Sequence, residues 1–367
     1  RGHQEEGHVY RDQGAHESAL LAYERALKIN PVLRACLTSQ LQILTSQRRE
    51  RQAIFVATQI EKLDATPKEL LVVTDLIAQG RIRRAENLCR RFLTTNPKHV
   101  EGMRLLADIG SRLGVLDDAD FLLESARGFA PDNIQIQMDY IQVLRKRQHF
   151  AKALAEAESL LERDPDNPQF MSLYAIESMQ AGDYEQAIVL LNQVLEKVPG
   201  DPVTLTTKGH ALKTRGESGK AVAAYQEAIV SQPAHGEAYY SLANLKTYQF
   251  SDNELARMQA QEQNLNLSYM ERVYLCFALA KAYEDRHAYA DAFAYYAQGN
   301  VLKKAESRYD AGTMQKEFAA TQAVCRRELF ARHATNGDPS PDPIFVLGLP
   351  RAGSTLLEQI LSSHSQV

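Results

Sequence analysis

The stretch from Gly209 to Pro233, GHALKTRGESGKAVAAYQEAIVSQP, decides the fold of this chain. Small side chains at Gly209 and Ala221 permit two antiparallel helices to cross closely, and Tyr225 is large enough to fill the space toward the next helix. The second helix ends before Pro233, because proline lacks an N–H donor and disfavours a helical residue before it. The stretch therefore predicts one hairpin of two α-helices.

The same pattern recurs along the chain with a period of 34 residues. The repeated prolines are Pro97, Pro131, Pro165, Pro199 and Pro233, and twelve residues before them stand Ala85, Ala119, Ala153, Ala187 and Ala221. This period is typical of tetratricopeptide repeats. We therefore expect an all-α fold, a right-handed solenoid of about nine tetratricopeptide helix pairs over residues 1–300.

Two parts of the array are less regular. Ala53 and Ala85 are only 32 residues apart, which indicates a small deletion between them. The pair over residues 236–267 has Ala243 at the small position of its first helix, but its second helix, near residues 255–265, has a weak pattern. After the array, apolar residues at helical spacing between Asp310 and Ala334 predict one helix within residues 301–335 that caps the solenoid.

Residues 336–343 are rich in turn formers and predict a linker, after which the pattern changes. Ile344–Leu347 is an unbroken apolar run, as expected of a strand buried in a parallel sheet. Gly348 and Gly353 bracket a turn whose N–H groups can surround an anion, and a helix from Leu356 to His364 adds its positive end. Residues 344–367 thus predict the first βα unit of an α/β, P-loop-like domain.

The turn departs from the nucleotide-binding Walker A loop in one important place. Its glycine spacing and Thr355 match that loop, but Ser354 occupies the lysine position, and the positive charge lies at Arg351 instead. ATP and GTP hydrolases need that lysine on the β- and γ-phosphates, as does a nucleotide kinase, so the departure argues against these enzymes.

The run Pro350-Arg351-Ala352-Gly353-Ser354-Thr355-Leu356 resembles the 5′-phosphosulfate loop of sulfotransferases, which use 3′-phosphoadenosine 5′-phosphosulfate (PAPS) as sulfuryl donor. The flanking residues also resemble the bacterial branch that joins tetratricopeptide repeats to a sulfotransferase domain, and more distantly the tyrosylprotein sulfotransferases. The resemblance covers about 25 residues. It implies that Arg351 and the backbone of Ala352, Gly353, Ser354 and Thr355 hold the 5′-phosphate and sulfate, with no metal.

The resemblance also implies a catalytic base, a glutamate in the tyrosylprotein enzymes, at a position beyond Val367. His364 stands roughly 15 Å from the loop by helical rise, so we interpret it as a helix-terminus residue. We expect residues 1–367 alone to be inactive. Two functions remain open: a PAPS-dependent sulfotransferase acting on a hydroxyl acceptor, or a non-catalytic protein-interaction module.

The composition of the chain argues against several kinds of binding partner. A net charge of −4 gives no electrostatic case for nucleic acid or an anionic membrane, and no apolar stretch is long enough to span a bilayer. The four cysteines are far apart, which favours packed thiols over disulfides or metal ligands. With no signal peptide, we expect a cytoplasmic location.

The first helix of each tetratricopeptide pair is expected to line a concave groove. Counting from the repeat register, the candidate contacts in this groove are Arg104, Asp108, Gln142, Arg145, His210, Lys213, Tyr240 and Asn244. This mixed polar and aromatic set is suited to an extended peptide. A protein or peptide hydroxyl is therefore the first expectation for the acceptor, with carbohydrate and small metabolites still open.

Overall fold

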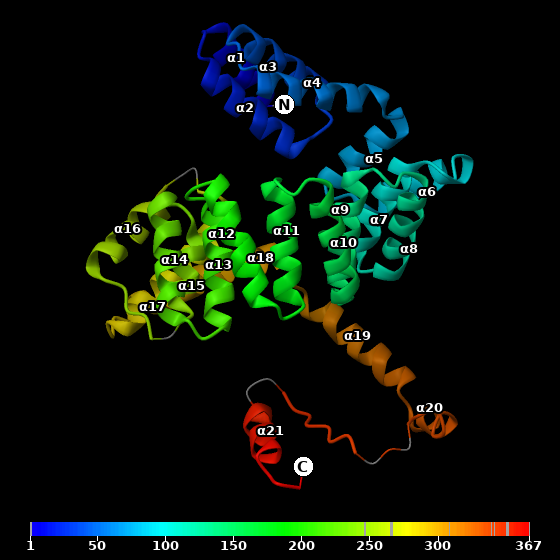
Figure 1. The fold of residues 1–367 in the computed structure, drawn as a ribbon, viewed down its shortest axis with the longest axis vertical. Helices are drawn as coiled ribbons and strands as arrows, with labels where there is room; N and C mark the ends of the chain where they lie inside the picture. Colours follow the sequence, from blue (N-terminus) through cyan, green and yellow to red (C-terminus); the bar gives the residue numbers. More distant parts are fainter. Residues whose placement is uncertain are drawn as a thin grey trace. The chain divides into compact units, whose positions relative to one another are not determined.

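The computed structural model describes residues 2–245, 247–264, 267–307, 309–338, 340, 342–349 and 352–366 (Figure 1). The chain divides into two compact units, residues 1–299 (unit 1) and 300–367 (unit 2). Every regular element in the described residues is a helix, and none of them forms a strand.

Unit 1 is built of consecutive helix pairs, as the tetratricopeptide pattern predicts, so the solenoid fold is confirmed. Its helices are α1 (Gly2–Asp12), α2 (His16–Ile29), α3 (Arg34–Ser46), α4 (Glu50–Ala65), α5 (Lys68–Ala78), α6 (Ile82–Thr95), α7 (Val100–Leu113), α8 (Leu116–Phe129), α9 (Ile134–Lys146), α10 (Phe150–Arg163), α11 (Pro168–Gln180), α12 (Tyr184–Lys197), α13 (Pro202–Thr214), α14 (Ser218–Ser231), α15 (Gly236–Ala243), α16 (Asp252–Glu262), α17 (Tyr269–Asp285) and α18 (Tyr289–Ser307), the last of which continues into unit 2. From α5 to α14, each helix packs on its pair partner and on the adjoining helix of the next pair.

The repeated alanines and prolines have the roles that their spacing predicts. All five alanines of the regular repeats are completely buried, because two helix backbones meet at each of them. The second helices end two residues before the repeated prolines, as α12 does at Lys197 before Pro199 and α14 at Ser231 before Pro233. After Pro131, Pro165 and Pro199, the residue two positions on caps the next first helix: Asn133, Asn167 and Asp201, the last by accepting a hydrogen bond from the Thr204 N–H.

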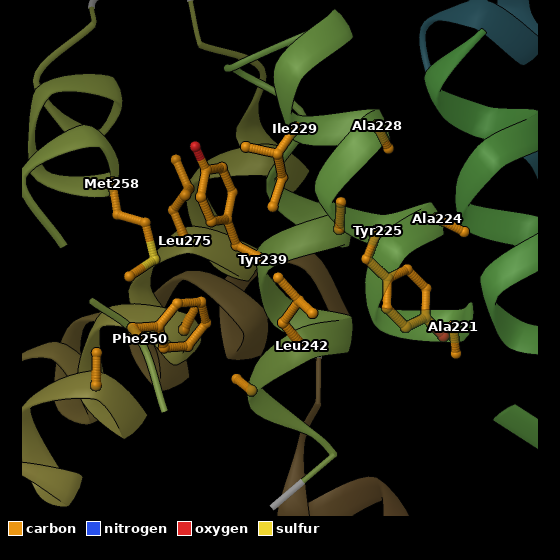
Figure 2. Close-up of a cluster of buried hydrophobic side chains, with 14 of the residues drawn as sticks. Ala221, Ala224, Tyr225, Ala228, Ile229, Tyr239, Leu242, Phe250, Met258 and Leu275 are labelled. Atoms are coloured by element: carbon orange, nitrogen blue, oxygen red, sulfur yellow. The ribbon is translucent and has the colours of Figure 1, made fainter. Parts of the chain in front are cut away.

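Large tyrosines fill the space between neighbouring pairs. Tyr225 of α14 and Tyr239 of α15 are fully buried in a cluster that also includes Leu242, Phe250 and Met258 (Figure 2). Gly209 of α13 lies directly against the Tyr225 ring, and Gly7 of α1 has the same relation to Tyr23. These two helix crossings, α1 on α2 and α13 on α14, therefore depend on a glycine facing a buried tyrosine.

The turn inside each pair from α5–α6 to α13–α14 has a left-handed residue at a fixed position of the repeat. Glycine occupies this position at Gly114, Gly182 and Gly216. Because glycine has no Cβ, it adopts the left-handed conformation without steric strain. Gln148 has the same conformation, with φ of 60°, at the corresponding position of the intervening repeat. The shared backbone geometry shows that the turn is imposed by helix packing even where the local residue disfavours it.

The expected irregularities appear at two places in unit 1. Packing between α4 and α5 is sparse, and Ile54 and Phe55 of α4 are about two-thirds exposed, at 66% and 65%. Farther along, α16 is a short helix with a Ser251–Glu254 capping box, and α15 packs mainly on α17. Leu265, at the end of the weak second-helix pattern, lies outside the described residues.

Unit 2 corrects two expectations. The single helix expected between residues 310 and 334 is two helices, α19 (Ala311–Val324) and α20 (Arg327–Arg332). None of their residues is buried, and short helices without tertiary packing are only marginally stable, so one continuous helix is not stabilised.

The strand expected over Ile344–Leu347 is irregular backbone, because a strand needs a ladder partner and the described residues offer none. The helix after the turn is present as α21 (Ser354–Ser362). The capping role of residues 301–335 stays a prediction.

We expect Gly209→Ala to destabilise unit 1 by about 1–3 kcal/mol, because the new methyl group would overlap the buried Tyr225 ring. The matched control is Gly219→Ala in α14, where nothing lies within 4 Å of the added atom. That change should raise stability by about 0.5–1 kcal/mol through the better helix propensity of alanine. Urea unfolding followed by circular dichroism measures both changes, and equal effects would contradict the close-crossing interpretation.

We expect native protein at about pH 8 to react with iodoacetamide at Cys325 alone, because it is the exposed cysteine and the thiolate is the reactive form. Burial raises the pKa of Cys36, raises that of Cys89 to about 12 and raises that of Cys276 to about 11. Mass spectrometry should therefore find a single adduct before unfolding and adducts on all four cysteines in urea. Rapid native labelling of Cys89 would contradict its placement against the Gly102 carbonyl.

Candidate functional site

The predicted groove residues all lie on first helices of their pairs. Arg104 and Asp108 are on α7, Gln142 and Arg145 on α9, His210 and Lys213 on α13, and Tyr240 on α15, with Asn244 at its C-terminal cap. We call the surface formed by these helices the first-helix face. Gln142, Lys213 and Asn244 are exposed there, whereas the other candidates are partly buried by neighbouring side chains.

A cavity of about 250 Å³ lies on this face between α7 and α9 (the α7–α9 cavity). It is lined by Arg104, Asp108, Ser111, Arg112, Leu123, Asp139, Gln142, Val143 and Lys146. Three of the residues predicted from the repeat register are therefore brought together in one hollow. Ser111 and Lys146 were missed by the sequence reasoning, although Lys146 lies one turn after Gln142 on the same side of α9.

Arg104 joins the two repeats that form the cavity. Its guanidinium donates to Glu101 at 2.7 and 2.8 Å within α7 and to Asp139 of α9 at 2.9 Å. Burial opposes ionisation of both partners, yet the Arg104 contact holds the pKa of Glu101 below its usual range, and the two carboxylates hold the pKa of Arg104 above its own. Arg104 is thus a structural bridge with its donors already committed.

Arg145 also forms an ion pair between repeats, in this case with a residue of the next repeat. Its Nε donates at 2.8 Å to the Oε1 atom of Glu177, a fully buried carboxylate of α11. A buried carboxylate is costly without a cation, so Arg145 is needed to keep Glu177 in place. Its side chain is 30% exposed, which leaves part of the guanidinium on the first-helix face.

His210 links a groove position to the core. Its Nδ1 lies 3.0 Å from the Tyr225 hydroxyl, and its Nε2 lies 3.6 Å from Glu237 of α15. The contact with His210 lowers the pKa of Glu237, whereas burial, helped by Glu237, raises the pKa of Tyr225 to about 12. Tyr225 therefore stays a neutral hydrogen-bonding partner near pH 7.

An aromatic cluster adjoins the predicted Tyr240. The Tyr240 ring lies 5.3 Å from Tyr274 and 6.1 Å from Phe277, both of α17, and Phe277 lies 6.4 Å from Tyr296 of α18, measured between ring centroids. All four rings are half-buried, so they offer apolar surface on one side. The register could have identified Phe277, which stands three residues before Ala280 just as Tyr240 stands three residues before Ala243.

The predicted phosphate loop lies in unit 2, and the structure describes part of it. Arg351 lies outside the described residues. Ala352, Gly353, Ser354 and Thr355 are exposed, and Gly353 precedes α21 with φ of 91°, a left-handed conformation suited to glycine. No side chain caps α21, so its first N–H groups lack a side-chain acceptor. His364 lies beyond the last residue of α21, in agreement with its interpretation as a terminus residue.

Two further classes of site receive no support from the described residues. Those residues contain no group of three or more His, Cys, Asp or Glu side chains placed to hold a metal ion. Within the same residues, every helix is too short or too polar to cross a lipid bilayer.

Comparison with protein families finds tetratricopeptide repeats in three segments. Tetratricopeptide repeat profiles match residues 1–32 and 206–262, and the tetratricopeptide domain of cytochrome c-type biogenesis protein H matches residues 88–204. A sulfotransferase family profile matches residues 343–367, the short segment that carries the predicted loop. The chain therefore contains tetratricopeptide repeats along most of unit 1.

One curated relative, an uncharacterized protein of Aquifex aeolicus (strain VF5), is 28% identical over 237 residues, which are 64% of this chain and 31% of the relative. The chain thus spans about a third of that protein's length. Similar solved structures include MamA from Desulfovibrio magneticus RS-1, with a TM-score of 0.42 and 12% identity over 45% of this chain and 94% of that one. YrrB, described as a tetratricopeptide protein with an unusual peptide-binding site, has a TM-score of 0.38 and 15% identity over 60% of this chain and 97% of its own.

We expect Arg104→Ala to lower the free energy of unfolding by about 2 kcal/mol, because it removes the charged hydrogen bond to Asp139 that joins α7 to α9, together with the bonds to Glu101 within α7. Arg112→Ala is the matched control, since Arg112 is half-exposed and pairs only with Asp108 of its own helix among the described residues. Its effect should stay below about 0.5 kcal/mol. Urea unfolding measures both variants, and an Arg104 effect no larger than that of Arg112 would refute the bridging role.

Proposed function

We propose that this chain comes from a PAPS-dependent sulfotransferase whose tetratricopeptide array recruits the acceptor or a partner protein. The observation that carries the proposal is the sulfotransferase family match over residues 343–367, which contains the Pro350–Thr355 loop. The tetratricopeptide matches over unit 1 support the recruiting role, because such arrays present extended binding surfaces.

The described part of the loop is compatible with an anionic donor. Gly353 has no Cβ, and nothing lies within 4 Å of the place where one would be, so a phosphate could approach the backbone closely. The uncapped N-terminus of α21 offers N–H donors and the positive end of a helix dipole. Ser354 and Thr355 add exposed hydroxyl groups that can donate to phosphate oxygens.

PAPS, when bound, supplies an activated sulfuryl group. The acceptor hydroxyl oxygen forms a bond to sulfur as the bond from sulfur to the 5′-phosphate oxygen breaks, and a base takes the hydroxyl proton. Arg351 and the Ala352–Thr355 backbone would stabilise the negative charge left on the phosphate. These residues act by position and charge, and none of them is proposed as the base.

The first-helix face supplies the proposed docking surface for the acceptor. Its exposed polar side chains lie along α9, α13 and α15, and the aromatic cluster at Tyr240 adds half-buried apolar surface. Extended peptides combine polar main-chain groups with alternating side chains, which such a surface can accommodate. A protein or peptide hydroxyl is therefore the proposed acceptor. The unpaired buried thiols fit a reducing compartment such as the cytoplasm.

A second function is a non-catalytic interaction module. It is favoured by the extent of the tetratricopeptide matches, which reach from residue 1 to residue 262 with gaps, against 343–367 for the sulfotransferase family. The two functions differ in one measurable property: only the enzyme must bind the adenosine-phosphate donor.

We expect the full-length protein to bind 3′-phosphoadenosine 5′-phosphate, the product form of the donor, in isothermal titration. Arg351→Ala should weaken this binding by about 10- to 100-fold, the effect of losing a charged hydrogen bond to phosphate. Arg332→Ala is the matched control, because it removes an exposed arginine of α20, outside the loop. Its affinity should equal that of the wild type.

The outcomes separate the two functions. Failure of the wild type to bind would remove the sulfotransferase proposal and leave the interaction module. Binding that is unchanged in Arg351→Ala would keep the enzyme but remove the assignment of this residue.

A further inference from the structure

The α7–α9 cavity contains cationic donors that the fold leaves unused. The Lys146 ammonium donates to the Ser111 hydroxyl at 2.7 Å and forms no ion pair with any described residue. Arg112 contacts Asp108 through Nε, at 2.9 and 3.0 Å, and its two terminal nitrogens have no hydrogen-bond partner within the described chain. Donors from two adjacent repeats therefore converge on one hollow.

The carboxylates in the cavity wall are already satisfied. Both oxygens of Asp108 accept from Arg112. Asp139 accepts from Arg104 and from the Gln135 amide, and Glu101, just outside the lining, is bound by Arg104 from the other side. Among the residues that line the cavity, three cations (Arg104, Arg112 and Lys146) face two carboxylates (Asp108 and Asp139). The third carboxylate, Glu101, shares Arg104 with Asp139, so Lys146 is the cation whose described partner is a neutral hydroxyl.

The neutral wall groups suit the same ligand. Gln142 precedes Lys146 by one turn and is exposed, so its amide can donate beside the ammonium. The Ser111 hydroxyl lies against the Lys146 ammonium and can also donate. Planar carboxylates are preferred partners of such charge-assisted donors.

The size of the cavity limits what can enter. At about 250 Å³ it is smaller than the roughly 300–1,000 Å³ typical of pockets for whole small-molecule ligands. It can accept one side chain from a longer molecule that lies along the first-helix face. An Asp or Glu side chain meets both the size and the charge requirement.

We propose that the α7–α9 cavity binds the carboxylate of an acidic side chain in an extended peptide held on the first-helix face, with Lys146 as its main partner. The inference rests on the proposed peptide-binding role and assigns it a specificity: sequences with an Asp or Glu at one fixed position. It is independent of the loop in unit 2.

The test is a selection of random peptides, displayed with both ends fused so that no free terminus is present, on the immobilised full-length protein. We expect enrichment of Asp or Glu at one position with the wild type and loss of that preference with Lys146→Glu. Lys98→Glu makes the same charge change at an exposed lysine outside the cavity and should leave the preference intact.

The strongest selected peptide then serves as a defined probe, together with its acid-to-amide version, in fluorescence anisotropy. On the wild type the amide version should bind about tenfold more weakly, as expected for one charged hydrogen bond. On Lys146→Ala the two versions should bind equally, because the carboxylate has lost its partner. Circular dichroism checks that the variant, changed at an exposed residue, is folded.

Each remaining outcome counts against the proposal in a distinct way. Peptides selected without an acidic preference, or an acid-to-amide difference that persists in Lys146→Ala, would overturn the carboxylate site and leave the peptide-binding role standing. If no peptide is enriched on any variant, the peptide-binding role and this inference fail together, while donor binding by the loop is unaffected.

Discussion

The close crossing of two helices in each pair is the constraint on which the rest of the structure depends. At the crossing, a backbone must approach another backbone, so only alanine or glycine fits, and a buried tyrosine such as Tyr225 then occupies the space beside it. This geometry fixes the angle between the helices and, through it, the position of every side chain that the first helices present. The repeat spacing in the sequence is a consequence of this packing.

Charge is used in unit 1 mainly to join repeats. Arg104 reaches from α7 to α9, Arg145 from α9 to a buried carboxylate of α11, and His210 from α13 to Glu237 of α15. Each of these residues holds a position that could have contacted a ligand. The side chains left for recognition are those without an ion-pair partner, and Lys146 is the clearest of them.

Much of the fold could be predicted from the sequence. An alanine and a proline, such as Ala221 and Pro233, recur at the same offset in the regular repeats, and each of these two positions has one physical role. The register also placed Tyr240 and Gln142 on first helices. It could not show that Arg104 and Arg145 are committed to carboxylates, since these partners lie 35 and 32 residues away. The strand predicted from the apolar pattern of Ile344–Leu347 was also wrong. An apolar segment forms a strand only when a neighbouring strand provides hydrogen-bond partners.

The sparse packing between α4 and α5 has a consequence for how the array unfolds. Solenoids are cooperative because each repeat is stabilised by the interface with the next, so a weak interface uncouples the segments on its two sides. We therefore expect α1 to α4 to form a block that can open while the repeats after it stay folded. In hydrogen exchange such a block has its own opening free energy, and the amides of α1 to α4 would exchange as a group ahead of those in α7 to α14.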